Sequence, residues 1–342
     1  MSQALAGLTT LRTGGPAERL IVADTEAELL DAVARADAAG EPLLVLGGGS
    51  NVVLADEGWP GTVVLVRTRG VAAEVDGCSG AWVTVAAGEP WDDLVERAVQ
   101  EGWSGLEALS GIPGLSGATP IQNVGAYGQE VADTLARVRA YDRIRRETVT
   151  LAAGDCGFGY RTSRFKADPT RYVVLEVVFQ LPLGSLSAPV RYAELSGVLG
   201  IETGDRAPSG DVREAVLALR RRKGMVLDPG DHDTWSVGSF FTNPVLGAAQ
   251  AEGLPETAPR WSQPDGTVKA SAAWLVEQAG FPRGYARGAA ALSGKHALAL
   301  TNRGSATTGD VLALAREIRD GVRAAFGVTL VPEPTLIACT LD

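Results

Sequence analysis

Glycine and proline are concentrated in the stretch from Ser110 to Gly128, and this composition restricts the fold of the 342-residue chain more than any other feature. The stretch reads SGIPGLSGATPIQNVGAYG, and its glycines are Gly111, Gly114, Gly117, Gly125 and Gly128. Positions without a Cβ disfavour a regular helix and allow the backbone to curve closely around a ligand, for which Gln122 and Asn123 add side-chain donors. The same composition also suits a series of tight turns that bind nothing.

A second glycine-rich loop lies in the sequence LVLGGGSNVVL, from Leu44 to Leu54. The GxGxxG spacing of a Rossmann site is missing, and no amphipathic helix follows to receive a pyrophosphate. A GxxxxGK[ST] phosphate loop is missing as well. Consecutive amides can still form a concave anion site, here from Gly47, Gly48, Gly49, Ser50 and Asn51. Two such loops predict an extended, pyrophosphate-bearing cofactor, although tight turns remain the alternative for each.

Charge and cysteine content exclude several classes of protein. The net charge of −10 argues against a nucleic-acid groove or a polybasic membrane anchor. The three cysteines and two histidines are too widely spaced for a zinc site, so we expect no metal and reduced thiols. The first residues lack the features of a signal peptide, and no run of ~18 apolar residues occurs. We therefore expect a cytoplasmic protein.

Hydrophobic periodicity predicts a mixed α+β chain. Thr25 and Glu28 have the spacing of a capping box before a helix, between strands at 19–23 and 43–46, and a strand at 63–66 completes a βαβ-type unit. The remaining predicted strands are 81–86, 138–141, 148–151, 172–181, 235–241, 297–301, 329–331 and 336–339. The remaining predicted helices are 91–100, 211–223, 271–279 and one that begins near 307–310.

Four polar residues stand in unusual surroundings. Arg161, in GYRTSRFK, can hold a carboxylate through two parallel hydrogen bonds, or it is a solvated cation at a strand end. Lys223 ends a helix, where a cation complements the helix dipole or clamps a phosphate. Glu333, in LVPEPTLI, is costly to bury unless it is paired or protonated, but it also suits an exposed turn. Ser239, in VGSFFTNP, lacks the elbow and histidine of a nucleophile, which leaves an ordinary strand serine or a proton donor.

Five motifs occur in the order LGGGSN, GIPGLSGATPIQNVGAYG, GYRTSRFK, VGSFFTNP and LVPEPTLI. Together they resemble the UDP-N-acetylenolpyruvoylglucosamine reductase family of FAD enzymes, which make UDP-N-acetylmuramate for peptidoglycan, and the resemblance covers essentially the whole chain. It implies a two-lobed FAD-binding domain of the vanillyl-alcohol-oxidase type and an α/β substrate-binding domain. The expected boundaries are 1–75 for the first lobe, joined by returning strands at 329–342, then 76–210 for the second lobe and 211–328 for the substrate domain.

The resemblance also implies a mechanism and its residues. FAD is expected to bind without a covalent link, NADPH to reduce it, and hydride to pass to C3 of the enolpyruvyl group. Ser239 would then protonate C2, while Arg161 and Glu333 stabilise the developing charge. FAD contacts are expected from both glycine loops, at Gly47, Gly48, Gly49, Ser50, Asn51, Gly111, Gly114, Gly117, Gln122, Asn123 and Gly125.

Substrate contacts are expected from Tyr160, Tyr192, Lys223, Asn243 and Gln278. The sequence VRYAELSG around Tyr192 resembles a family subtype with an extra tyrosine-bearing loop. The chain departs from the family pattern at Thr242, where a basic residue is common, and at Val237, where a smaller one is usual.

Two other functions fit parts of this pattern. One is another FAD-dependent oxidoreductase of the same fold, such as an oxidase, although no histidine lies in either glycine loop to tether a flavin. The other is a non-catalytic nucleotide-sugar binding protein, which would not need Arg161, Ser239 and Glu333. No nucleic acid and no membrane insertion are expected.

Overall fold

The computed structural model describes residues 3–342. Contacts group the chain into two compact units. Unit 1 comprises Met1–Ala17, Gly49–Trp59 and Arg222–Asp342, and unit 2 comprises Glu18–Gly48 and Pro60–Arg221. The three-part division expected from the sequence stays a prediction.

Unit 2 is built on an antiparallel five-stranded sheet with the strand order β11-β10-β12-β7-β6. Alternation sets its two faces: Val83 and Val85 of β7 are buried, whereas Trp82 and Thr84 between them are only partly covered. Its strands are β6 (Val71–Asp76), β7 (Gly80–Ala86), β10 (Leu135–Asp142), β11 (Glu147–Ala152) and β12 (Tyr172–Leu181).

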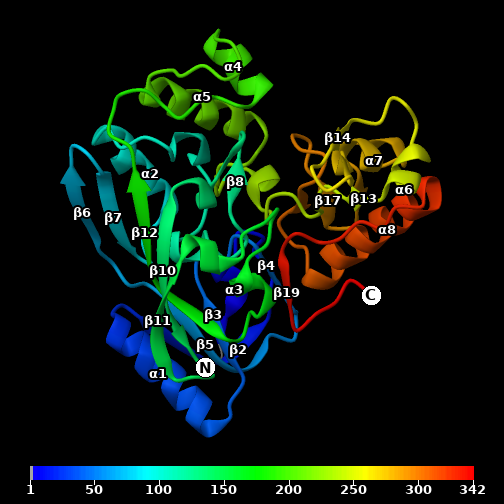
Figure 1. Ribbon diagram of the computed structural model, residues 1–342. Coiled ribbons are helices and arrows are strands. Elements are labelled where there is room, and N and C mark those ends of the chain that lie inside the picture. Colours follow the sequence, from blue (N-terminus) through cyan, green and yellow to red (C-terminus); the bar gives the residue numbers. More distant parts are fainter. Residues whose placement is uncertain (1–2) are drawn as a thin grey trace. The chain divides into compact units, whose positions relative to one another are not determined.

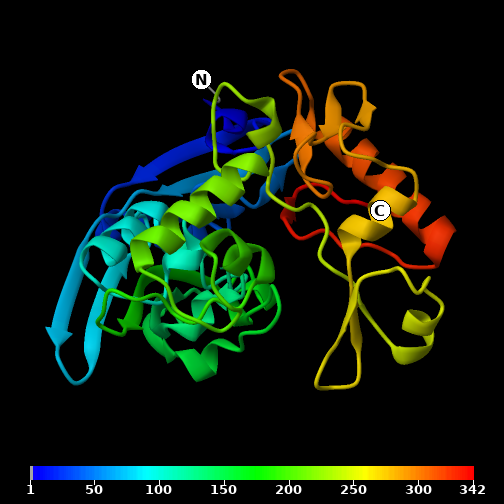
Figure 2. The same ribbon diagram turned by 90° about the horizontal axis from the view of Figure 1, so that it is seen from above.

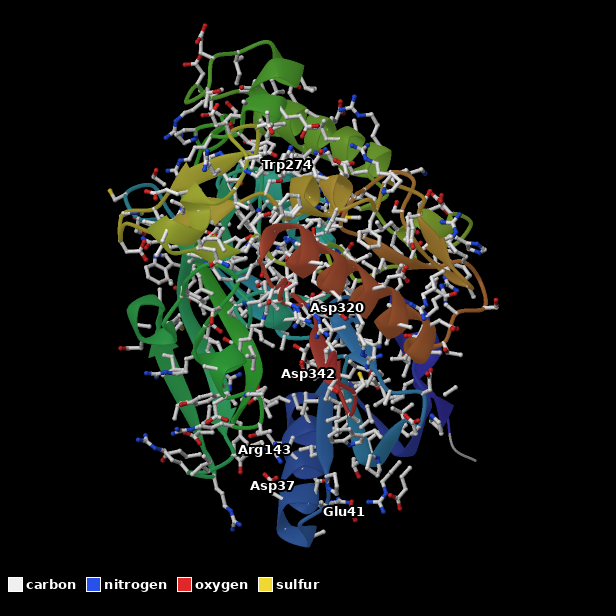
Figure 3. The ribbon with its side chains drawn as sticks, turned by 90° about the vertical axis from the view of Figure 1, so that its right-hand side faces the viewer. Asp37, Glu41, Arg143, Trp274, Asp320 and Asp342 are labelled. Carbon is white, nitrogen blue, oxygen red and sulfur yellow. The ribbon has the colours of Figure 1, made fainter. Side chains whose placement is uncertain are left out.

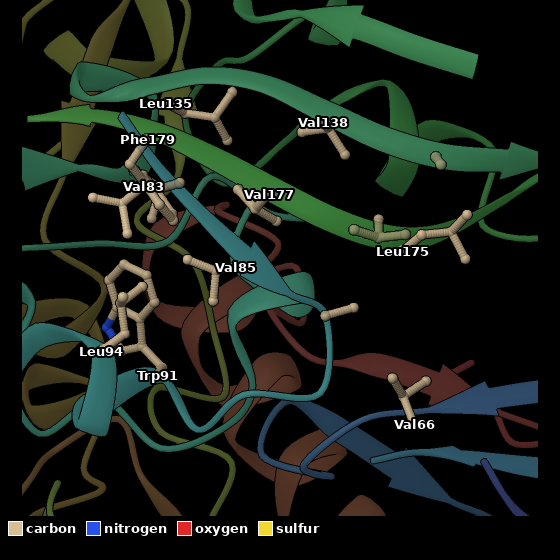
Figure 4. Close-up of a cluster of buried hydrophobic side chains, with 14 of the residues drawn as sticks. Val66, Val83, Val85, Trp91, Leu94, Leu135, Val138, Leu175, Val177 and Phe179 are labelled. Carbon is tan, nitrogen blue, oxygen red and sulfur yellow. The ribbon is translucent and has the colours of Figure 1, made fainter. Parts of the chain in front are cut away.

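Helix α2 (Trp91–Gln100) supplies large apolar side chains to the buried face of this sheet. Trp91 and Leu94 lie on the helix face directed at Val85 and Phe179 (Figure 4), and the rings of Trp91 and Phe179 are 5.8 Å apart. Burial of such aromatic and aliphatic groups contributes ~1.5–3 kcal/mol for each side chain, so this contact fixes the position of α2 on the sheet.

A second sheet has the strand order β1-β2-β5-β3. Its strands are β1 (Gln3–Ala4), β2 (Pro16–Ala23), β3 (Leu43–Leu46) and β5 (Trp59–Val66), with β3 and β5 parallel. Helix α1 (Glu26–Ala39) starts at the predicted capping box of Thr25 and Glu28. Arg143, after β10, pairs with Asp37 of α1 at 2.6 Å (Figure 3) and so ties the helix to the larger sheet.

Helices α4 (Ala193–Leu199) and α5 (Ser209–Arg222) form a further layer of unit 2 (Figures 1 and 2). Their apolar faces pack together through Leu195, Val212, Val216 and Leu219. The shorter elements of unit 2 are α3 (Arg164–Ala167), β8 (Gly125–Ala126) and β9 (Gln129–Glu130).

Unit 1 combines small sheets with helices around its own core, which includes Leu11, Val53, Phe240 and Leu341. Its longest helix, α8 (Thr308–Phe326), packs against β17 and β18 (Figure 1). Strand β19 (Thr335–Ile337) pairs in parallel with β4 (Val52–Leu54). The other elements are α6 (Ala248–Glu252), α7 (Ala272–Gln278), β13 (Val245–Leu246), β14 (Arg260–Ser262), β15 (Val268–Ala270), β16 (Ala286–Arg287), β17 (Ala290–Leu292) and β18 (Leu300–Asn302).

The structure corrects two predicted strands. The stretch 329–331 is not a strand, and 235–241 is not a continuous one, because only isolated bridges join Ser239 to Ala299 and Phe241 to Pro332. Trp235 accepts a hydrogen bond from the amide of Asn302, so the stretch from Trp235 to Ser239 has one residue more than the stretch it faces. Such an extra residue is a β-bulge, and the positive φ of 78° at Gly238 accommodates it.

Candidate functional site

The two glycine loops touch each other within unit 2. Gly47 and Gly48 follow β3, and a Cβ added to Gly48 would lie 2.8 Å from Cα of Gly114 in the second loop. Only a residue without a side chain permits this approach. Within residues 3–342, the amides of Gly47, Gly48 and Gly114 donate to no other residue. These amides can therefore donate hydrogen bonds to phosphate oxygens, which act only as acceptors.

Other amides of the second loop are already used inside the protein. The amide of Gly111 donates to Oδ1 of Asp92 at 2.6 Å, and the amide of Gly117 donates to the carbonyl of Ala87. A Cβ at Gly117 would lie 2.4 Å from Cβ of Ala87. Gly111 and Gly117 thus shape the loop, and their amides serve the protein rather than a ligand.

The side chain of Asn123 is buried and takes part in holding the second loop together. It donates to Oε2 of Glu130 at 2.7 Å and accepts from the amide of Ala132 at 3.0 Å. Its φ of 47° is uncommon outside glycine and fits asparagine better than most residues. Gln122 beside it is half-buried.

Arg161 lies in a tight turn whose ends, Gly159 and Thr162, exchange backbone hydrogen bonds. Its φ of 53° places it in the left-handed region, which costs a non-glycine residue roughly 1 kcal/mol or more. The guanidinium donates to the carbonyl of Gly125 at 2.7 Å and to that of Asn123 at 3.4 Å. Arg161 is thereby fastened to the second glycine loop, 5.6 Å from the Tyr160 ring.

Tyr192 is 45% exposed at the N-cap of α4, so it is available to a ligand. Its ring packs edge-on against Tyr127 of the second glycine loop, with centroids 5.5 Å apart. Tyr127 also interacts with Arg220 of α5, whose pKa burial lowers to about 10. We did not select Tyr127 or Arg220 from the sequence. The sequence did contain one indication that Arg220 is buried: it follows Val216 by four residues and so lies on the buried face of α5.

In unit 1, the first glycine loop continues as Gly49, Ser50 and Asn51. Gly49 has a φ of 62°, and a Cβ there would lie 2.1 Å from the carbonyl oxygen of Leu8. Asn51 accepts a hydrogen bond from the amide of Thr335 at 3.0 Å, at the entrance to β19. The C-terminal strand is thus joined directly to this loop.

Ser239 is half-buried and precedes two fully buried rings, Phe240 and Phe241. These rings pack edge-on with centroids 5.1 Å apart and anchor the segment in the core of unit 1. The amide of Phe240 donates to the carbonyl of Leu298 at 2.7 Å. The serine therefore sits on the bulge, between the anchored Phe240 and Gly238, which has a positive φ.

Glu333 lies beside this serine-bearing segment. Its amide donates to the carbonyl of Phe240 at 2.8 Å, and its neighbour Pro332 is bridged to Phe241. Glu333 is half-buried. The structure thus brings the backbones of Ser239 and Glu333 together from sites almost a hundred residues apart in sequence.

The remaining selected residues have different surroundings. Oδ1 of Asn243 accepts from the amide of Ala272 at 2.9 Å and so caps α7, while Gln278 is exposed at the other end of that helix. Lys223 follows α5 and is half-buried, whereas Arg222 is exposed. Arg161 belongs to unit 2, and Ser239 and Glu333 belong to unit 1.

Within residues 3–342, no group of three or more histidine, cysteine or acidic side chains is arranged to hold a metal. No helix in this range has the length and apolar character needed to cross a bilayer.

Known proteins match the chain along nearly its whole length. Residues 17–149 match the FAD binding domain family, and residues 228–337 match the C-terminal domain family of UDP-N-acetylenolpyruvoylglucosamine reductase. The enzyme of that name from Cutibacterium acnes is 58% identical over 98% of this chain and 90% of its own. The one from Thermobifida fusca is 55% identical over 98% of this chain and 97% of its own.

A solved structure agrees with these matches. The crystal structure of UDP-N-acetylenolpyruvylglucosamine reductase from Thermus caldophilus covers 98% of each chain, with 27% identity and a TM-score of 0.67. The predicted fold class, an α+β chain with an FAD-binding domain and a second domain, is confirmed. The paired glycine loops, with amides open to phosphate, fit FAD. The matches to the FAD binding domain family and to the reductases show that the chain is an FAD-dependent oxidoreductase. It belongs to the UDP-N-acetylenolpyruvoylglucosamine reductase family.

Proposed function

We propose that this protein reduces UDP-N-acetylglucosamine enolpyruvate to UDP-N-acetylmuramate for peptidoglycan synthesis, with FAD as cofactor and NADPH as co-substrate. One hydride from NADPH and one proton convert the enolpyruvyl double bond to a lactyl ether, which balances the reaction. The observation that carries this proposal is the hydrogen bond from Glu333 to Phe240, because it brings a carboxylate-bearing segment beside Ser239 in a chain of this family.

The glycine loops are the proposed cofactor site. When bound, FAD supplies a two-electron carrier that accepts a hydride from a nicotinamide and delivers it to the substrate. Gly47, Gly48 and Gly114 would hold the pyrophosphate through their backbone amides. Gly49, Ser50, Asn51 and Gln122 would complete the site. Gly111, Gly117, Asn123 and Gly125 would support it by shaping the second loop, since each of them contacts other residues of the protein.

Ser239 is the proposed proton donor to C2. A serine hydroxyl is a weak acid, so it can serve only a strongly basic, carbanion-like centre, formed after hydride has reached C3. Partial exposure keeps the hydroxyl accessible, while the buried Phe240 and Phe241 restrict its movement. Both properties suit a group that must reach one carbon of a bound substrate.

Arg161 and Glu333 are the proposed stabilisers of the charge that develops on the carboxylate and at C2. The planar guanidinium of Arg161 is held by two carbonyls of the second glycine loop, which reduces the reorganisation needed at the transition state. Glu333 would act as its acidic partner. Their charges must stabilise the intermediate without removing the basicity on which Ser239 depends.

Substrate binding is proposed for Tyr160, Tyr192, Lys223, Asn243 and Gln278. The exposure of Tyr160 and Tyr192 supports a role in contacting a ligand. The side-chain oxygen of Asn243 caps α7, so its side-chain nitrogen would be the atom that donates a hydrogen bond to a ligand. The tyrosine at the start of α4 also supports assignment to the subtype with the extra tyrosine-bearing loop.

We further propose a cytoplasmic location, where NADPH is available and thiols stay reduced. All three cysteines are free, in agreement with a reducing compartment.

A test of the proposed function begins with purified protein and its colour. We expect a yellow protein that oxidises NADPH only when UDP-N-acetylglucosamine enolpyruvate is present. A colourless protein that never binds added FAD would refute the proposal. Turnover of oxygen without use of the enolpyruvyl substrate would favour an oxidase, and ligand binding without flavin chemistry would favour a nucleotide-sugar binding protein.

A further inference from the structure

The N-terminal segment of unit 1 packs directly on the first glycine loop. A Cβ at Gly49 would lie 2.1 Å from the carbonyl oxygen of Leu8 and 2.8 Å from Cα of Thr9. The amide of Thr10 then donates to the carbonyl of Gly49 at 3.1 Å. Segment and loop are thus held in one arrangement by close packing and by a backbone hydrogen bond.

The hydroxyl of Thr10 reaches a different part of unit 1. It donates to the carbonyl of Ser236 at 2.6 Å and lies 3.5 Å from the carbonyl of Gly49. Thr10 is 8% exposed and Ser236 is 5% exposed. A buried hydroxyl without a hydrogen-bond partner destabilises the fold, so the native structure favours keeping this bond.

Ser236 connects the Thr10 hydrogen bond to the residues just before Ser239. Its own hydroxyl accepts from the amide of Gly238 at 3.2 Å, and Gly238 carries the positive φ of the bulge. Backbone hydrogen bonds hold the segment at Trp235, through Asn302, and at Phe240, through Leu298. Between these two points the segment bulges, so the bond from Thr10 restrains the part that bears the serine.

We propose that Thr10 is a positioning residue that fixes Ser239 relative to Gly49 of the cofactor loop. Its amide binds the loop, and its hydroxyl binds the segment that leads to the serine. This inference rests on the proposed function, in which Ser239 donates the proton to C2.

The chemistry makes such positioning valuable. A proton donor must lie within ~2.6–3.2 Å of its acceptor, and a misplacement of about 1 Å can slow a reaction roughly 100-fold. Reduction of the cofactor by NADPH does not involve Ser239. Loss of the Thr10 hydroxyl should therefore slow the substrate half-reaction selectively.

Thr10→Val is the test variant, because valine keeps the shape and removes the hydroxyl. Thr9→Val is its matched control: Thr9 is 7% exposed, and its hydroxyl contacts the carbonyls of Ala6 and Thr13 within the same segment. Thr10→Ser restores the hydroxyl and should restore the behaviour of the original protein.

Stopped-flow measurements of the two half-reactions separate the effects. In Thr10→Val we expect reoxidation of the reduced protein by the enolpyruvyl substrate to slow by about 10- to 100-fold, while reduction by NADPH changes less than about threefold. FAD affinity should stay close to that of the original protein, because the amide bond to Gly49 remains. Hydrogen exchange of residues 236–239 should become faster in Thr10→Val and stay unchanged in Thr9→Val.

Equal slowing of both half-reactions in Thr10→Val, or the same selective slowing in Thr9→Val, would overturn the inference. Ser236→Ala provides an independent test if Thr10→Val does not fold, because it removes the acceptor of the Gly238 amide and should produce the same selective loss. An unmodified protein that cannot use the enolpyruvyl substrate would instead refute the proposed function.

Discussion

The amide of Glu333 donates a 2.8 Å hydrogen bond to the carbonyl of Phe240, the residue that follows Ser239. This backbone contact brings together a carboxylate-bearing residue and a hydroxyl-bearing residue from distant parts of the chain. Because the bond joins main-chain atoms, either side chain can be changed without removing the contact itself. The two roles can therefore be tested one at a time.

Ser239→Ala should leave reduction by NADPH nearly unchanged and almost abolish reoxidation by the enolpyruvyl substrate. The hydroxyl is the proposed source of the proton for C2, and alanine has none. Rapid-mixing absorbance of the flavin measures both steps in the same sample, so the reductive step is an internal control. Equal loss of both steps would remove support for proton donation.

Arg161→Lys should slow the substrate half-reaction by roughly 100-fold or more, which is the effect of losing one well-placed stabilising donor. Lysine cannot reproduce the planar fork that reaches the carbonyls of Gly125 and Asn123. Arg164→Lys is the control, because Arg164 is exposed in the same motif. Normal steady-state turnover in Arg161→Lys would count against the assigned role.

Gly48→Ala should weaken FAD binding. The new Cβ would lie 2.8 Å from Cα of Gly114, a backbone atom that cannot move without shifting the second loop. Gly197→Ala is the control, because a Cβ there meets no atom within 4 Å. Fluorescence titration of the apoprotein with FAD compares the two variants, and equal affinities would show that contact between the loops is not needed.

In Asp92→Asn, the free energy of unfolding should depend less on pH in the acidic range than it does in the original protein. Burial alone would raise the pKa of Asp92, but the hydrogen bonds from Arg213 and from the amide of Gly111 outweigh it and hold the pKa below its usual range. A carboxylate with a depressed pKa stabilises the fold above its unfolded pKa of ~3.9, and this contribution is lost as pH falls through the folded pKa.

The difference in melting temperature between the original protein and Asp92→Asn should therefore be larger at pH 7 than near pH 3. Asp93→Asn is the control, since Asp93 is exposed in the same first turn of α2 and shares its helix dipole. A difference that does not change with pH would show that the charge of Asp92 is not what stabilises the contact.

Local patterns predicted much of the fold. The helix at 91–100 and the strands at 43–46 and 172–181 have the predicted boundaries, because periodicity and flanking turns are properties of short stretches. The capping box at Thr25 was predicted for the same reason. The predicted strand at 235–241 was wrong, although Gly238 within a strand pattern is a known sign of a bulge.

Contacts between distant segments could not be predicted from local patterns. Nothing in the sequence around Thr10 indicates a bond to Ser236. The residues around Val52 do not identify Thr335 as its partner, although the resemblance implied that strands at 329–342 return to the lobe of residues 1–75. The candidate site residues were selected because five motifs occur together in order. That selection could not show that the amide of Gly111 is already occupied by Asp92.

Unit 1 is assembled from three separate stretches, and its core needs all of them, from Leu11 and Val53 to Leu341. During synthesis on a ribosome, this core must stay incomplete until Leu341 has emerged. Unit 2, whose last residue is Arg221, has all of its chain much earlier. The nascent protein must therefore carry the unsatisfied apolar surfaces of residues 3–17 and 49–59 until residues 222–341 have been synthesised, a period when aggregation or chaperone capture competes with folding.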